Sequence, residues 1–571
     1  MNRNRHFLWA TALIAVSLIL GFYAGKYYRI MGPQFNMLRS GQNKVNEALD
    51  VISRHYVDTV DVNRLSESAV NKIVSELDPH SAYIPAPDVE AANEDLEASF
   101  SGIGIQFNMP FDTILVISVI SGGPAEKAGL MPFDRIITVD DSLVAGRELG
   151  TTKIMRMLRG PKDSKVRLGI QRGNAGELAQ FELTRGDIPN QSIDVSYKVH
   201  DDIGYIKITK FSRSTYKDFL TAIAKLRDEG AKGFIIDLRD NPGGYMESAI
   251  NVINEFLPKG RLIVYMKGRS YPRTDSYSNG KGTCQDAPLV VLINELSGSA
   301  SEIFSGAIQD NDRGTIIGRR SYGKGLVQTK LDLSDRSELL LTIARYYTPS
   351  GRCIQKDYEL GNAEEYSHDL YNRYMHGEYY SADSIKMNDS LEYKTAGRRT
   401  VYGGGGVMPD IFIPRDTTGM TSYYSSVVNT GVLYQFALDY SDKNQERLSS
   451  FDTYGKLHEY LQQQPIIQEF ADFAASKGIR KRPTLINISK NLIETQLYAF
   501  IVRNFFDYEG FYPILFKDDP TLNKAIEVIS EGRWKPELIG LYEAERNNAP
   551  LYAVEIPGRA IKKPLYAETG E

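Results

Sequence analysis

The chain has 571 residues, 42% of them hydrophobic and 24% charged, and a formal net charge of −5 at pH 7. This length exceeds one ordinary core, so three or more structural units are expected. The slightly acidic balance argues against nucleic acid as the main partner. Cys284 and Cys353 are the two cysteines, too few for a disulfide framework or a cysteine-based zinc site. One disulfide and two buried thiols both remain open.

The N-terminus carries an uncharged apolar run, Phe7–Gly25, which is long enough to cross a bilayer as a helix of about 20 residues. A cleaved signal peptide is the alternative, but its apolar stretch is usually about 7–15 residues and ends at a small-residue cleavage site. "KYYRI" follows the run instead of such a site. We therefore predict a signal anchor or transmembrane helix within residues 1–30, with the bulk of the chain outside.

Two regions of different pattern follow the anchor. Residues 31–98 are predicted to be helical, because apolar residues such as Val45, Leu49 and Ile52 recur at helical spacing. Residues 99–187 contain short β-branched runs separated by glycine turns, which predicts a small β-rich domain. Two short helices are expected in it, in "GGPAEKAGL" and "KIMRMLRG".

Strand and helix patterns alternate through residues 188–414, which predicts an α/β layer with a mainly parallel sheet. The expected strands include "GYIKITKF", "GFIIDL", "RLIVYM" and "PLVVLIN". Polar sites tend to form where such strands end. Residues 355–406 are rich in tyrosine, aspartate and asparagine and are predicted to be an insertion with little core of its own. Residues 415–571 return to a helical pattern.

The run "NELSGSASE", Asn294–Glu302, places three serines between an expected strand and an expected helix. Serine attacks a carbonyl only when a base takes its proton. None of the seven histidines lies in a motif within the α/β region, which argues against a Ser-His-Asp triad. Lys324 in "RRSYGKGLVQ" is the other candidate base, but its pKa would have to fall from about 10.4 to near 7. On these facts alone, a solvated loop lysine is the preferred interpretation.

The stretch Asn294–Gln328 resembles the signature of the C-terminal processing (tail-specific) serine proteases. The resemblance implies that Ser299 of "SASE" is the nucleophile, that Lys324 is the general base and that Gln328 supports the lysine. Three residue types at the spacings of that family reverse the preferred interpretation of Lys324. Glu302 is then expected to be a helix-start or supporting acid.

The same resemblance extends to "DLRDNPGGYM", whose backbone amides would help to form an oxyanion hole. Gly243 or Gly244 would pair there with the amide of Ala300. A strand-to-helix connection needs glycine in any case, so the two roles are compatible. "ARYYTPSGRCIQ" and "GVMPDIFIP" match family segments that are normally close together. The insertion that separates them here leaves a lid, a docking surface or no function open.

Residues 99–187 resemble a PDZ domain, in which successive amides hold a terminal carboxylate and a strand accepts the peptide. The residues assigned to this peptide site are Gly102, Ile103, Gly104, Ile105, Ile154 and Leu158. The alternative for the apolar residues is ordinary core. Arg159 matches an arginine that links peptide occupancy to activity in the family, and an exposed helix-end arginine is its alternative.

The predicted fold class is a multidomain α/β protein whose protease core is crotonase-like, with parallel strands and helices. An inserted PDZ domain, helical N- and C-terminal regions and the N-terminal transmembrane helix complete it. The domains are residues 1–30 (anchor), 31–98 (helical), 99–187 (PDZ), 188–414 (core) and 415–571 (helical).

The predicted function is that of a bacterial envelope endopeptidase, held in the inner membrane with its bulk in the periplasm, or secreted if the anchor is cleaved. It would capture unstructured protein C-termini and cut them by Ser-Lys acyl transfer, without a metal or other cofactor. An adaptor or envelope lipoprotein partner and a homo-oligomer are left open. Two alternatives of other classes are a membrane-anchored PDZ adaptor with a degenerate core and a crotonase-type enzyme acting on acyl-CoA.

Overall fold

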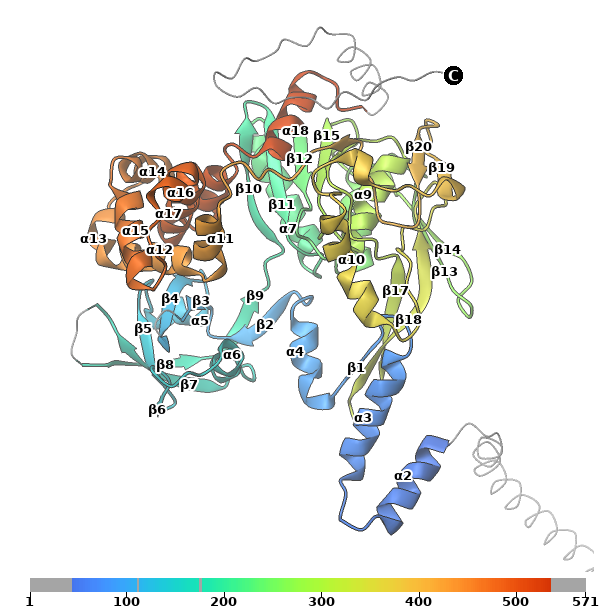
Figure 1. The fold of residues 1–571 in the computed structure, drawn as a ribbon, viewed down its shortest axis with the longest axis horizontal. Helices are drawn as coiled ribbons and strands as arrows, with labels where there is room; N and C mark the ends of the chain where they lie inside the picture. The colour runs from blue at the N-terminus through green and yellow to red at the C-terminus, as the bar shows by residue number, and fades with distance from the viewer. Residues whose placement is uncertain (1–43, 110–111, 174–176, 536–571) are drawn as a thin grey trace, which may run out of the picture. The chain divides into compact units, whose positions relative to one another are not determined.

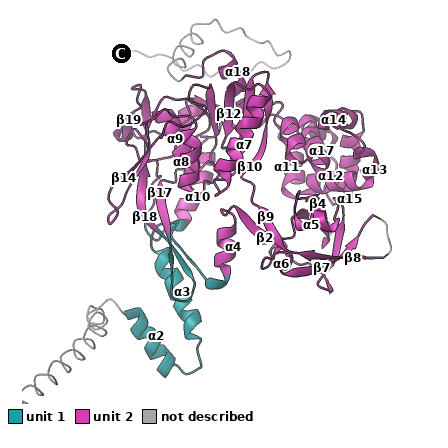
Figure 2. Cartoon of the chain, turned by 180° about the vertical axis from the view of Figure 1, so that it is seen from behind, with its two compact units in different colours: residues 1–87, 330–341, 359–363 teal, residues 88–329, 342–358, 364–571 magenta. Residues whose placement is uncertain are grey.

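The computed structural model describes residues 44–109, 112–173 and 177–535. It divides into two compact units (Figure 2), the first comprising residues up to 87 with 330–341 and 359–363, and the second comprising the rest. Within the described ranges, no helix is both long and apolar enough to cross a membrane. The predicted anchor, Phe7–Gly25, lies outside the described residues.

The first unit is largely helical, as predicted for this part of the chain. It contains α2 (Lys44–His55), α3 (Val62–Ser75) and strand β1 (Ala82–Ile84). Asp61 begins α3, because its carboxylate accepts a hydrogen bond from the amide of Arg64. β1 pairs antiparallel with the first residues of β18 (Glu338–Tyr347), a strand that continues into the second unit. The short η1 (Ala86–Asp88) and α4 (Val89–Glu94) follow.

The β-rich domain lies within the second unit. Its main sheet has the order β3-β4-β5-β7-β8, with β6 paired to β5, while β2 pairs separately with β9. Strand β3 is therefore an edge strand of that sheet. The bounds are β2 (Ser99–Gly102), β3 (Ile105–Asn108), β4 (Ile114–Val119), α5 (Pro124–Ala128), β5 (Arg135–Val139), β6 (Ser142–Leu143), α6 (Thr151–Leu158), β7 (Lys165–Gln171), β8 (Ala179–Thr184) and β9 (Gly186–Pro189).

A six-stranded sheet organises the remainder of the second unit (Figure 1). Its order is β10-β11-β12-β15-β16-β21, and every pairing is parallel except that of β10 with β11. This confirms the predicted, mainly parallel α/β layer. The bounds are β10 (Ile193–His200), β11 (Ile203–Ile208), β12 (Gly233–Asp237), β15 (Leu289–Ile293), β16 (Thr315–Gly318) and β21 (Ile411–Phe412).

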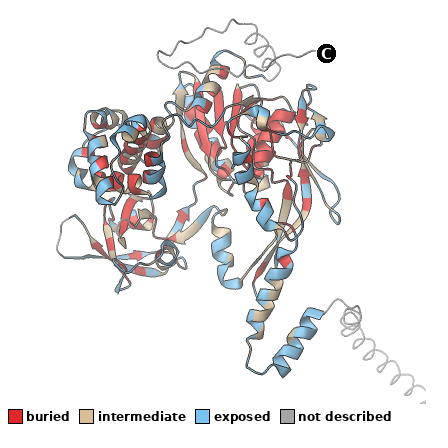
Figure 3. Ribbon diagram, viewed as in Figure 1, coloured by how far each residue is buried: buried red, intermediate tan, exposed pale blue. Residues whose placement is uncertain are grey.

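Consecutive residues of β11, β12, β15 and β16 are all buried (Figure 3). Since alternate side chains of a strand point to opposite sides, both faces of the sheet are covered. On one face, Phe234 and Ile236 pack in a core with α7 (Thr215–Asp228), α8 (Met246–Asn254) and α9 (Ala300–Asp310). On the other face, Ile235 packs in a core shared with the C-terminal helices. These are α11 (Ser422–Asn429), α12 (Val432–Lys443), α13 (Gln445–Leu448), α14 (Tyr454–Gln462), α15 (Ile466–Ser476), α16 (Pro483–Ile488), α17 (Lys490–Leu515) and α18 (Pro520–Ser530).

A second sheet, of order β1-β18-β13-β14 with β17 (Leu326–Asp332) on β18, corrects one prediction. The segment "RLIVYM" is a strand, β13 (Leu262–Lys267), but it belongs to this sheet and not to the parallel one. Its partners β14 (Thr274–Tyr277) and β18 both run antiparallel to it. An antiparallel partner is reached through a short connection, so β13 needs no crossover helix before β14.

The predicted insertion has secondary structure of its own. It contains α10 (Ala363–Met375), the short turns η3 (Ala382–Ser384) and η4 (Asp389–Leu391), and the pair β19 (Glu392–Lys394) and β20 (Thr400–Tyr402). Cys353 before the insertion and Cys284 are both free thiols. The two cysteines are therefore not joined in this structure.

Candidate active site

Ser299 lies in the turn between strand β15 and helix α9, as predicted. Its backbone has φ 52° and ψ −112°, a conformation that favours glycine, and it stands at the N-cap of α9. Holding a serine there costs of the order of 1–3 kcal/mol, and such strain persists only where the surroundings fix it. The turn presents the serine at the end of a buried strand, just before an entirely buried helix.

The carboxylate of Glu302 fixes this turn and joins it to the segment 320–325, which contains Lys324 and is called the lysine loop below. One of its oxygens accepts hydrogen bonds from the amides of Ser299 (2.8 Å) and Lys324 (2.9 Å). The other accepts from the amide of Gly323 (2.7 Å) and the hydroxyl of Ser321 (2.5 Å). Glu302 is fully buried, and this burial raises its pKa to about 7 while the four donors favour the charged form. It is the predicted helix-start acid, and it also supports the lysine loop.

Tyr346 of strand β18 makes a second connection between the same two segments. Its hydroxyl lies within hydrogen-bonding distance of the backbone carbonyls of Ser299 (3.0 Å) and of Lys324. The side chain is buried, which raises its pKa well above the usual range and keeps the hydroxyl protonated as a donor. The backbones of Ser299 and Lys324 are thus held together by a carboxylate on their amides and a hydroxyl on their carbonyls.

Lys324 and Gln328 are in direct contact. The side-chain nitrogen Nζ of Lys324 donates to Gln328 Oε1 at 3.0 Å. Lys324 lies in the loop before β17, and Gln328 is within that strand. The amide oxygen of glutamine accepts a hydrogen bond without adding a negative charge, so it orients the lysine without an ion pair.

The glycine turn after β12 lies directly against Ser299. A Cβ atom built on Gly243 would be 2.7 Å from Ser299 Cβ and 3.0 Å from the amide nitrogen of Ala300. Gly243 and Gly244 have φ values of 111° and 137°, which only glycine adopts readily. The amide of Gly243 donates to Asn241 Oδ1 at 2.8 Å. Within the described part of the chain, the amides of Gly244 and Ala300 donate to no protein acceptor.

Asn241, which the sequence analysis did not single out, holds the glycine turn against the serine turn. Its carbonyl accepts hydrogen bonds from the Gly298 amide (3.0 Å) and the Ser301 hydroxyl (3.0 Å). Its side chain also donates to the carbonyl of Ile208 at 2.9 Å. The turn sequence "DNPGG" was the available signal, because a buried asparagine beside two glycines is a common turn anchor.

The residues assigned to the peptide site lie in the β-rich domain. Ile103 and Gly104 link β2, which ends at Gly102, to the edge strand β3, which begins at Ile105. Ile103 is buried in the domain core, as are two residues of helix α6, Ile154 and Leu158. Ile105 is half-buried and packs against that core. The structure therefore places four of these residues, Gly102 to Ile105, at the start of the edge strand β3.

Arg159 ends helix α6 and turns toward α4 and β2. It forms an ion pair with Glu94, and its guanidinium carbon lies 4.4 Å from the centre of the Phe100 ring. Burial raises the pKa of Glu94, and Arg159 opposes that rise. The arginine is thus connected to the strand that leads into the Gly102 loop.

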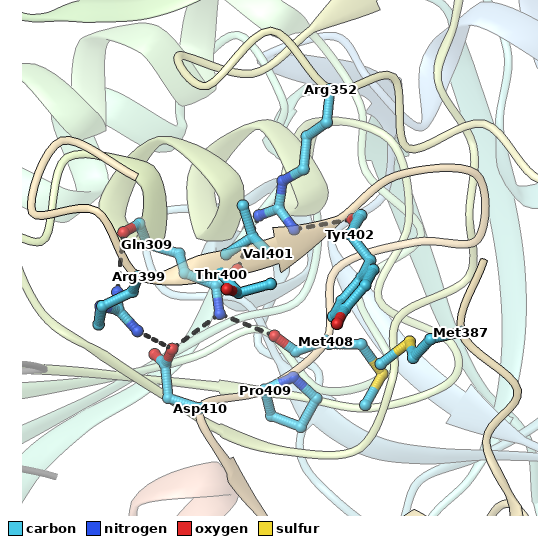
Figure 4. Close-up of a pocket in the computed structure, with 10 residues that line it drawn as sticks. All are labelled: Gln309, Arg352, Met387, Arg399, Thr400, Val401, Tyr402, Met408, Pro409 and Asp410. Carbon is cyan, nitrogen blue, oxygen red and sulfur yellow. Dashed lines mark hydrogen bonds and ion pairs between the residues drawn. The ribbon is translucent and has the colours of Figure 1, made fainter. Parts of the chain in front are cut away.

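A cavity of about 330 Å³ lies at the other end of helix α9 from Ser299 (Figure 4). It is lined by Gln309 of α9, by the β20 segment and by Asp410 before β21, where Arg399 forms an ion pair with Asp410. Gln309 lies ten residues after Ser299, so at a helical rise of 1.5 Å per residue this cavity is about 15 Å from the serine turn.

Comparison with known families assigns most of the chain. Residues 202–361 match the peptidase family S41, and residues 101–183 match the PDZ domain. Residues 32–87 match the N-terminal domain of the activating protease CtpB. Residues 423–507 match a family of unknown function.

Several relatives are similar over most of their own length. A carboxy-terminal-processing protease of Bartonella bacilliformis is 37% identical over 317 residues, covering 55% of this chain and 72% of that protein. The carboxy-terminal processing protease CtpA of Bacillus subtilis is 35% identical over 355 residues, covering 61% and 73%. A solved photosystem II D1 C-terminal processing protease shares 28% identity over 54% of this chain and 89% of its own, with a TM-score of 0.32, too low for its geometry to be transferred.

The S41 match and these relatives support a protease over the PDZ adaptor alternative. The chain belongs to the S41 family of carboxy-terminal processing serine proteases, and it carries the PDZ domain of that family.

Proposed function

We propose that Ser299 and Lys324 form the catalytic dyad of this protease. The assignment rests on one arrangement above all, the double connection of their backbones through Glu302 and Tyr346. Two segments distant in sequence are brought together there by buried groups. The strained backbone of Ser299 supports the same assignment, because such strain is concentrated at functional sites.

In the proposed reaction, neutral Lys324 takes the hydroxyl proton of Ser299 while Oγ attacks the carbonyl carbon of the scissile peptide. Collapse of the tetrahedral intermediate breaks the C–N bond, and the lysine returns the proton to the departing amine. A water molecule then attacks the acyl-enzyme, again losing its proton to Lys324, and the acid product leaves with the serine restored. Gln328 orients the lysine throughout.

The negative charge on the intermediate needs donors beside Ser299. The amides of Ala300 and of Gly243 or Gly244 are proposed for this role, because their turn lies against the serine. The amide of Gly243 is engaged by Asn241, whereas those of Gly244 and Ala300 donate to no acceptor within the described residues. Gly244 with Ala300 is accordingly the favoured pair.

The PDZ domain is proposed to capture the C-terminus of a protein substrate. The edge position of β3 supports this, because an extended peptide can add to it as a further strand. The segment Gly102–Ile105, which leads from β2 into β3, would receive the terminal carboxylate. Arg159, which is connected to that loop through Phe100 in β2, is proposed to couple capture to activity.

The dyad is tested with a loosely folded protein that ends in an apolar, free C-terminus. Ser299→Ala and Lys324→Ala should each abolish its cleavage, while Ser426→Ala, a change of an exposed serine in α11, should retain it. Cleavage by Ser299→Ala equal to that of the parent would refute the dyad. Equal cleavage of the substrate with an amidated C-terminus would refute capture by the PDZ domain and leave the dyad standing.

A location in the bacterial envelope is proposed from the apolar run Phe7–Gly25. The full chain should fractionate with membranes and be digested by a protease added outside the inner membrane. A chain lacking residues 1–30 should fractionate with soluble proteins. Recovery of the full chain in the cytoplasmic soluble fraction would contradict this location.

A further inference from the structure

Helix α10, in the insertion between the two matched family segments, has one face buried and one face exposed. Tyr366 and Arg373 are 5% and 3% exposed, whereas Tyr371 and Met375 are 59% and 61% exposed. Tyr366, Asp369 and Arg373 recur at helical spacing, so they share the buried face.

The guanidinium of Arg373 binds the backbone of the lysine loop. Nη1 donates to the carbonyl of Ser321 at 2.9 Å, and Nη2 donates to the carbonyl of Arg320 at 2.8 Å. Glu378 is the counter-ion that the two arginines share, because it accepts from Arg373 (3.2 Å) and from Arg320 (2.6 Å). A planar guanidinium that donates to two successive carbonyls fixes both the position and the direction of that backbone.

Lys356 contacts the next residues of the lysine loop, Tyr322 and Gly323. The Lys356 ammonium lies 4.3 Å from the centre of the Tyr322 ring and 4.0 Å from that of Tyr366. It also pairs with Asp369 of α10 at 2.9 Å. The amide of Lys356 donates to the carbonyl of Gly323 at 3.0 Å, adjacent to Lys324.

The lysine loop, which Arg373 and Lys356 contact, contains Lys324 of the proposed dyad. The hydroxyl of Ser321, whose carbonyl Arg373 binds, donates to Glu302. Glu302 in turn accepts from the amides of Ser299 and Lys324. A chain of buried contacts therefore runs from α10 to both proposed catalytic residues.

We propose that Arg373 is a positioning residue for Lys324, and that α10 is a clamp on the lysine loop. This rests on the proposed dyad. The insertion is thereby part of the catalytic apparatus of this chain, and neither a lid nor a docking surface is needed to explain its buried face.

Arg373→Ala should lower kcat while leaving KM within about threefold, because the lost interaction holds a catalytic group and does not bind substrate. A fall in kcat of about 10- to 100-fold is expected, since a 1 Å misplacement can cost about 100-fold. Tyr371→Ala, on the exposed face of the same helix, is the control and should be unchanged. Low-millimolar guanidinium should restore part of the kcat of Arg373→Ala.

If Arg373→Ala fails to fold, Arg373→Lys is used in its place. It keeps the positive charge, but the lysine ammonium lacks the planar group that donates to both carbonyls. In a Ser299→Ala background, either variant should speed amide hydrogen exchange at residues 321–325, a readout that needs no activity. Unchanged kcat, or unchanged exchange in a folded variant, would overturn the clamp. Activity in Lys324→Ala would instead refute the dyad, so the two failures are distinguishable.

Discussion

Substitution of Gly243 by alanine tests whether the glycine turn serves the chemistry or only the fold. The added Cβ would lie 2.7 Å from Ser299 Cβ, 2.8 Å from the Gly298 carbonyl oxygen and 3.0 Å from the Ala300 nitrogen. Carbon atoms in good contact are about 3.5–4.0 Å apart, so the glycine turn and the serine turn must separate by about 1 Å. The left-handed backbone adds roughly 1–2 kcal/mol of strain.

Gly230 provides the matched control, because it also has a positive φ of 92° but no atom within 4 Å of an added Cβ. Gly230→Ala should share the strain and lose stability, yet keep its kcat. Gly243→Ala should lose about 100- to 1,000-fold in kcat, because the added Cβ pushes away the amide of Ala300 and the loss of one oxyanion donor usually has an effect of this size. Both are measured by cleavage of a protein with a free apolar C-terminus and by thermal unfolding. A folded Gly243→Ala with the kcat of Gly230→Ala would refute the proposed oxyanion site.

Three further predictions concern the connections around the dyad and the PDZ domain. Tyr346→Phe should lower kcat about fivefold, because a hydrogen bond worth about 1 kcal/mol between its hydroxyl and the carbonyls of Ser299 and Lys324 is lost; an unchanged kcat would show that the hydroxyl is dispensable. Glu302 has a pKa raised from 4.5 to about 7, so its stabilising contribution is complete below pH 4.5 and is lost as the pH rises through about 7. Relative to Glu302→Gln, the free energy of unfolding in urea should therefore fall by about 3 kcal/mol across this window, and parallel curves for the two proteins would contradict the raised pKa. Arg159→Ala should reduce the preference for a free over an amidated C-terminus, whereas Arg156→Ala, an exposed arginine of the same helix, should not; equal preferences in both would leave Arg159 a structural contact.

Local patterns in the sequence predicted much of this fold. Continuous apolar runs in "GFIIDL" and "PLVVLIN" predict buried strands, and the structure places them side by side as β12 and β15. The strand "RLIVYM" was assigned to the wrong sheet, because its own pattern carries no information on its partner. Its partners in the structure are β14 and β18, both antiparallel to it.

Some residues of the proposed site could likewise be predicted from the sequence, and others could not. Ser299, Lys324 and Gln328 could be predicted because they match a family signature over a short stretch. Tyr346 and Asn241 were missed, since each acts through backbone contacts to residues brought near it by the fold. Arg373 could not be predicted at all. Its partners, the carbonyls of Arg320 and Ser321, lie about fifty positions away and are groups that every residue possesses.

Direct identification of the acylated residue tests the Ser-Lys mechanism most sharply. A peptide ester should accumulate as an acyl-enzyme, because the ester bond breaks faster than the acyl-enzyme is hydrolysed. The enzyme is mixed with the ester, quenched in acid and mapped by mass spectrometry. An acyl group is expected on Ser299 in the parent and none in Lys324→Ala. An acyl group on another residue, or on Ser299 at an equal rate without Lys324, would contradict it.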